Sequence, residues 1–91
     1  MYVETVDDAL DEVENHLGKS QSYYVNSSGE TVFRILVSDA DPRKIARFDL
    51  DLSKPHVIKE GVHINLETYK YEFGSVSQKK AIKNIHLKWR K

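Results

Sequence analysis

Histidines, carboxylates and an arginine recur in the middle of the chain at the two-residue spacing of a β-strand. His63, Asn65 and Glu67 alternate with apolar residues, and Arg47 and Asp49 alternate in the same way earlier in the chain. Alternate residues of a strand project from one face, so each set lies on one side of its strand. If the two strands are neighbours, these side chains meet on one polar sheet face.

Such a face carries the groups that split an RNA phosphodiester bond without a metal ion. The reaction needs a base for the 2′-hydroxyl, an acid for the leaving 5′-oxygen and a cation for the phosphorane oxygens. Histidine titrates near neutrality and serves either proton role. We assign proton transfer to His63 and His56, the orienting carboxylate to Glu67 and the phosphate clamp to Arg47. The alternative is the solvent face of a half-exposed sheet, where histidines and paired charges are common.

The same residues allow a metal site as a further alternative. Asp49, His63, Asn65 and Glu67 could ligate a divalent cation from one sheet face. The chain has no cysteine, no HxH or HExxH spacing and no glycine-rich phosphate loop. We therefore predict no metal and no cofactor.

The C-terminal segment is basic and interleaved with aromatic residues. Residues 79–91 hold six basic side chains, with His86 and Trp89 among them. Cationic side chains contact phosphates, and aromatic rings stack on bases. An amphipathic end that docks on the core explains the same pattern. Our candidates for RNA contact are Lys54, His86, Lys88 and Arg90.

Charge divides the chain into two halves, although its net charge is zero. Residues 1–51 hold 11 acids and 5 bases, and residues 52–91 hold 3 acids and 9 bases. This asymmetry fits either internal pairing of the halves or a basic surface for a polyanion beside an acidic flank. No apolar run approaches the roughly 20 residues of a membrane span, and we expect neither a secretory leader nor a membrane partner.

Periodicity predicts one N-terminal helix, over about residues 5–18. Val6, Leu10, Val13 and Leu17 form an apolar stripe at helical spacing. Thr5 fits the N-cap, and Gly18 fits the C-terminal stop.

The rest of the chain, from about 21 to 90, reads as strands. A hairpin is expected over 21–25 and 31–37, then strands over 45–52 and 62–67, the latter extending to 73 in one version. A last strand over 85–89 is favoured over a helix. We predict a single α+β domain, residues 1–91, with the helix packed on a four- to five-stranded, mostly antiparallel sheet.

Residues 41–67, DPRKIARFDLDLSKPHVIKEGVHINLE, resemble a pattern of C-terminal toxin domains in bacterial polymorphic toxins of the Rhs, LXG and contact-dependent inhibition types. The shared parts are Ala46 to Asp49, His56 with Val57, Gly61, and the H-x-N-x-E run from His63 to Glu67. Such domains are often similar to the barnase, EndoU, colicin and RelE group, in which helices pack on an antiparallel sheet that cuts RNA.

The resemblance implies a ribonuclease, with tRNA among its candidate substrates. It points to His56, His63, Glu67 and Arg47 as the site. It also implies secretion at the end of a larger toxin, action in the target-cell cytoplasm and a cognate immunity protein. We separately expect the free chain to be a monomer.

The rival hypothesis is a non-catalytic binding module, such as a cytoplasmic immunity or adaptor protein of a phage or mobile element. Its sheet face or its acidic helix would then dock a partner. This hypothesis predicts that His63→Ala changes nothing, whereas charge reversal at Asp7, Asp8 and Asp11 abolishes binding.

Overall fold

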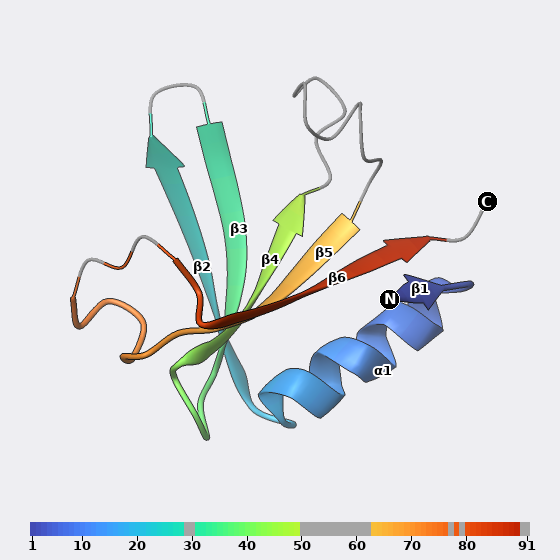
Figure 1. Ribbon diagram of the computed structural model, residues 1–91, viewed down its shortest axis with the longest axis horizontal. Helices are drawn as coiled ribbons and strands as arrows, with labels where there is room; N and C mark the ends of the chain where they lie inside the picture. Colours follow the sequence, from blue (N-terminus) through green and yellow to red (C-terminus); the bar gives the residue numbers. More distant parts are fainter. Residues whose placement is uncertain (29–30, 50–62, 77, 79, 90–91) are drawn as a thin grey trace.

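The computed structural model describes residues 1–28, 31–49, 63–76, 78 and 80–89 (Figure 1). Their elements follow the order β1 (Tyr2–Val3), α1 (Val6–Leu17), β2 (Gln21–Ser28), β3 (Thr31–Ser38), β4 (Lys44–Asp49), β5 (His63–Thr68) and β6 (Lys83–Trp89). The six strands form a sheet in the order β1-β6-β5-β4-β3-β2. All pairs are antiparallel except β1 with β6, which is parallel. The predicted α+β class, with its N-terminal helix on a mostly antiparallel sheet, is confirmed.

The sheet has more strands than the four to five predicted, because β1 adds a short edge strand. The amino group of Met1 donates to the carbonyl of His86, and the amide of Lys88 donates to the carbonyl of Met1, both at 2.9 Å. A strand of two residues is too short to show the two-residue alternation by which strands are recognised in a sequence, so β1 was not predicted. The strand forms through its pairing with β6.

Both ends of α1 are set by local chemistry, as the sequence predicted. The hydroxyl of Thr5 accepts a hydrogen bond from the amide of Asp8 at 3.1 Å and so caps the first turn. Gly18 follows the helix with φ +85°, a conformation that favours glycine.

The predicted apolar stripe of α1 is wrong at two of its four positions. Val6 and Leu10 are 62% and 54% exposed, whereas Ala9, Val13 and Leu17 are buried. Helical spacing fits both stripes, since each contains Val13 and Leu17. The face of the helix that packs against the sheet is therefore the one that carries Ala9, Val13 and Leu17.

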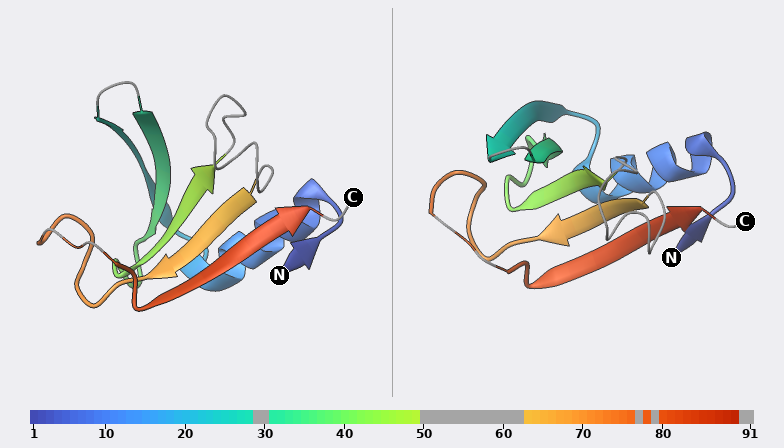
Figure 2. Two further views of the ribbon diagram at one scale, coloured as in Figure 1. Left: turned by 45° about the horizontal axis from the view of Figure 1, so that its top comes forward. Right: turned by 90° about the horizontal axis from the view of Figure 1, so that it is seen from above.

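One core lies between α1 and the sheet, and Figure 2 shows from two sides how the helix lies along one face of the sheet. Its buried side chains come from the helix and from four strands: Val3, Ala9, Val13, Leu17, Ala46, Ile64, Leu66 and Leu87. Ile64 on β5 stands opposite Leu87 on β6. The strand prediction for residues 85–89 is thereby confirmed, and the helical alternative is wrong. Within the described residues, no helix has the length and apolarity that a bilayer crossing requires.

A smaller cluster lies on the opposite face of the sheet. The chain leaves the sheet after β5, so the predicted extension of that strand to residue 73 is wrong. The amides of Tyr69 and Phe73 donate to the carbonyls of Arg43 and Pro42 at 2.8 and 2.9 Å. The segment thus turns back toward β4, and its two aromatic rings pack against the buried cluster Ile35, Val37 and Ile45.

Candidate functional site on the sheet face opposite the helix

Strand register gathers the polar residues of the middle strands on the face opposite α1. Arg47 of β4 stands opposite Asn65 of β5, which stands opposite His86 of β6. In a second row, His63 stands opposite Lys88. The two middle strands are neighbours, which was the condition for a shared polar face, and these residues come from three adjacent strands, β4, β5 and β6.

The alternative interpretation of this face as the solvent face of a half-exposed sheet is wrong at its centre. His63, Asn65 and Glu67 are 2%, 1% and 4% exposed, although they alternate with the apolar residues of β5 as predicted. β5 is an inner strand, flanked by long side chains of β4 and β6, and the segment after it folds back onto this face. Both faces of the strand are therefore buried.

Glu67 binds two neighbours through its two carboxylate oxygens. Oε1 lies 3.3 Å from Nε of Arg47, and Oε2 accepts a 2.6 Å hydrogen bond from the hydroxyl of Tyr69. Glu67 is almost fully buried, whereas the Arg47 side chain keeps 34% of its surface exposed. The carboxylate therefore anchors the inner part of an arginine that also reaches solvent.

Tyr69 is held protonated at neutral pH. Burial raises its pKa to about 12, and the hydrogen bond to Glu67 and the charge of that carboxylate act in the same direction. The phenol is consequently a permanent donor to Glu67 at physiological pH. With one oxygen on Tyr69 and the other beside Arg47, the carboxylate has a fixed orientation.

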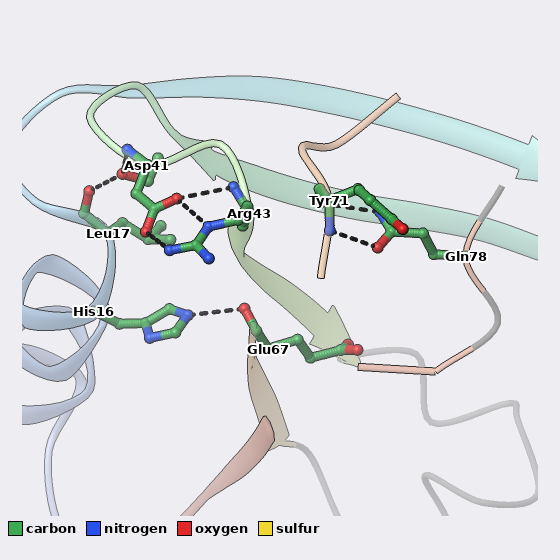
Figure 3. Close-up of polar contacts among 8 residues, drawn as sticks. His16, Leu17, Asp41, Arg43, Glu67, Tyr71 and Gln78 are labelled. Atoms are coloured by element: carbon green, nitrogen blue, oxygen red, sulfur yellow. Dashed lines mark hydrogen bonds and ion pairs between the residues drawn. The ribbon is translucent and has the colours of Figure 1, made fainter. Parts of the chain in front are cut away.

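The backbone of Glu67 is fixed from the other side of the sheet. Nε2 of His16, in the last turn of α1, donates to the carbonyl oxygen of Glu67 at 3.0 Å. Figure 3 shows this contact and the Glu67 side chain extending away from His16. The helix thus holds the residue whose carboxylate holds Arg47.

The structure brings Glu67 to Arg47 and places it far from His63. Glu67 follows His63 by four residues of the strand, a distance of about 13 Å along the backbone. His63 instead stacks on His86, with ring centroids 5.5 Å apart and planes 10° apart. His86 is half-buried, so it is the more accessible member of this histidine pair.

A cavity of about 350 Å³ opens beside Arg47. Most of its wall is apolar, and Arg47 and Gln78 are its polar side chains besides the Tyr69 phenol. The lining residues are Ile35, Ile45, Arg47, Tyr69, Phe73, Gly74, Val76 and Gln78. A planar or apolar group with a negative charge at one end fits this combination.

Hydrogen bonds fasten the segment that forms the outer wall of the cavity. The side chain of Gln78 accepts from the amide of Tyr71 and donates to its carbonyl, both at 3.1 Å (Figure 3). Gly74 makes the turn between them with φ +82°. On the inner side, the Phe73 ring lies 5.0 Å from that of Tyr24.

The turn that receives this segment is itself anchored by polar contacts. Arg43 donates to both carboxylate oxygens of Asp41 at 3.0 Å, which lowers the pKa of Asp41 (Figure 3). The hydroxyl of Ser38 donates to the carbonyl of Leu17 and accepts from the amide of Asp41. The carbonyls of Pro42 and Arg43 are thereby positioned for the segment after β5.

Four other residues were predicted to belong to the site: His56, Lys54, Arg90 and Lys88. His56, Lys54 and Arg90 lie outside the described residues. Lys88 is half-buried and shares the face of His63 and His86. Sequence reasoning missed Tyr69 as a partner of Glu67, although its position two residues later was the available signal.

Among the described residues, no group of three or more histidine, cysteine or acidic side chains could hold a metal ion. The side chain of Asp49, part of the metal alternative, lies outside what the structure describes.

No family model, no curated protein and no solved structure matches this chain.

Proposed function

We propose that the face opposite α1 binds RNA and cleaves it without a metal ion. The observation that carries the proposal is the placement of Arg47 and the stacked pair His63 and His86 on one antiparallel sheet face. A fixed cation and side chains that can accept and donate a proton are what phosphodiester transphosphorylation requires. The toxin resemblance of residues 41–67 points to the same reaction.

In this proposal the scissile phosphate lies over Asn65, between Arg47 and His86. These two residues stand on either side of β5, with backbones about 10 Å apart, two strand intervals. Arg47 neutralises the developing charge on the phosphorane, one histidine of the pair accepts the proton of the 2′-hydroxyl, and the other donates a proton to the leaving 5′-oxygen. The 2′-oxygen bonds to phosphorus as the 5′-oxygen leaves, which yields a 2′,3′-cyclic phosphate and a 5′-hydroxyl.

The proposal changes the role first assigned to Glu67. Both of its oxygens already contact Arg47 and Tyr69, so it acts as a positioning residue for the arginine. His63 and His86 become the proton carriers within the described residues, and His56 remains a candidate from the sequence. Delivery from a larger secreted toxin, and neutralisation in the target cell by an immunity protein, belong to the proposal through the resemblance.

The test is cleavage of total RNA and of tRNA by the purified chain, in chelator, read on a denaturing gel. We expect Arg47→Ala to slow cleavage about 10²- to 10³-fold and His86→Gln by about 10²-fold or more. Arg34→Ala is the matched control, since Arg34 is exposed and bonds to the Tyr23 hydroxyl on the other face. Intact RNA after incubation with folded protein, or equal rates for the two arginine variants, would reject the proposal.

A second candidate function, a protein-binding module, is favoured by the exposed side of α1. Val6 and Leu10 lie one helical turn apart and point to solvent, with exposed Asp7 and Asp11 beside them. An apolar strip with an acidic rim suits a basic amphipathic partner. The test is capture of a basic amphipathic partner by the intact chain. Loss of capture in the double variant Asp7→Lys with Asp11→Lys, together with normal capture by His63→Ala, would favour this function over cleavage.

A further inference from the structure

Strand β2 is an open edge of the sheet. Within the part of the chain that the structure describes, it is last in the strand order and pairs with β3 alone over its eight residues. Its sequence, QSYYVNSS, contains no charged residue, no proline and no glycine. Along such an edge, one row of backbone N–H and C=O groups points away from the sheet and can pair with another strand.

Apolar side chains are exposed along this edge. Tyr23, Tyr24 and Val25 are 56%, 43% and 52% exposed. Strand alternation places Tyr24 on the face of the cavity and the other two on the face of α1. No residue of β2 belongs to the buried clusters of the described residues, and Figure 1 shows the ends of β2 and β3 extending beyond α1.

The opposite edge of the sheet is protected in a way that β2 is not. There β1 pairs with β6, is only two residues long and is followed at once by α1. β6 also carries Lys83 and Lys88. Short edge strands and lysines are devices that prevent edge-to-edge pairing. Their absence from β2 marks it as a pairing surface.

We infer that a second copy of this chain pairs with β2 in the antiparallel direction and joins the two sheets into one. An uncharged strand meets its own copy without charge repulsion, and antiparallel pairing of identical strands has the two-fold symmetry of a closed dimer. In a register centred on Tyr24, that residue faces its copy, and Tyr23 faces Val25 of the other copy. The exposed apolar side chains then cover one another on both faces.

The dimer edge adjoins the cavity beside Arg47. The Tyr24 ring contacts Phe73, which lines that cavity. A second copy would therefore bury the outer side of a ring that supports the cavity wall. The inference does not depend on the proposed cleavage, because it rests on the edge alone.

The size of the edge predicts a weak dimer. Eight strand residues span about 27 Å, and one strand edge buries less than the roughly 800 Å² per partner of a standard stable interface. We expect dissociation constants in the micromolar to millimolar range.

The experiment is sedimentation equilibrium of the full chain from about 10 μM to about 1 mM, the range that brackets such a weak interface. The apparent mass should rise toward twice that of one chain. For Val25→Glu the apparent mass should stay at that of one chain, because the two new carboxylates of a dimer would lie about 7–8 Å apart across the two-fold axis. Within its own hairpin the new carboxylate stands opposite Arg34, so the fold tolerates it. Ile82→Glu, at an exposed position away from the edge, is the control and should dimerise normally.

Hydrogen exchange of the unaltered chain supplies a test that needs no variant. Alternate amides of β2 should exchange at least tenfold more slowly at the high concentration than at the low one. A constant single-chain mass overturns the inference. So does a dimer whose β2 amides are unchanged, or equal effects of the two glutamate variants.

Discussion

Glu67→Gln removes one charge from the buried group that holds Arg47 and keeps the shape of the side chain. The wild-type carboxylate faces Nε of Arg47 at 3.3 Å and accepts from the Tyr69 hydroxyl at 2.6 Å. Breaking a buried ion pair costs about 3–5 kcal/mol. Arg47 is one-third exposed, and the glutamine oxygen can still accept from Tyr69. We therefore expect a loss of about 2–3 kcal/mol in the free energy of unfolding.

Urea unfolding followed by circular dichroism measures this loss. For a chain of this size it corresponds to a fall in melting temperature of roughly 10–20 °C. Glu72→Gln is the matched control, because Glu72 is exposed, and it should stay within about 0.5 kcal/mol of the wild type. If Glu67→Gln also stays within that limit, the carboxylate does not hold Arg47 and the reasoning is refuted.

A cycle with Tyr69→Phe measures the coupling between the Glu67 carboxylate and the Tyr69 phenol. The phenol donates to the same carboxylate that contacts Arg47. The double variant Glu67→Gln with Tyr69→Phe should be less destabilised than the sum of the two single variants, by about 0.5 kcal/mol or more. Strict additivity would show that the carboxylate and the phenol do not stabilise each other.

Three further predictions follow from the same structure. The pKa of Tyr69 is raised above its ordinary value of 10.0 to about 12. The stability that this raised pKa contributes is therefore present below pH 10 and is lost as the pH rises toward 12. The unfolding midpoint of Tyr69→Phe, measured across this pH range, should lack this loss. Leu87→Ala should cost about 2–5 kcal/mol in urea unfolding because Leu87 is fully buried, whereas Leu10→Ala should stay within about 0.5 kcal/mol; similar losses would contradict the helix orientation. Thr5→Ala should cost about 1 kcal/mol through the lost cap of α1, and no change in thermal unfolding would contradict that role.

The elements that the sequence determined by itself are those whose signals are local. The hydroxyl of Thr5 and the freedom of Gly18 act within one helical turn, so the ends of α1 could be read from the chain. Two-residue alternation likewise sets which residues of β5 share a face. The grouping of His63, Asn65 and Glu67 therefore needed no knowledge of the rest of the fold.

Two-residue alternation, together with neighbouring strands, also predicted that Arg47 and Glu67 share a sheet face. It could not predict that the two side chains are in contact. Their contact depends on the register between β4 and β5, which places Glu67 opposite Ile45 and diagonal to Arg47. Tyr69 joins them only because the chain leaves the sheet after β5. That departure is stabilised by carbonyls of the turn at Pro42 and Arg43, more than twenty residues earlier.

Burial was decided by the tertiary structure alone. Alternation gives two faces to a strand, but it does not say whether a second layer covers the polar one. The same limit applies to α1, where two overlapping stripes fit the helical period and packing against the sheet selected Ala9 over Val6 and Leu10. In both cases the local pattern was compatible with two answers, and the free energy of packing against residues distant in the sequence chose between them.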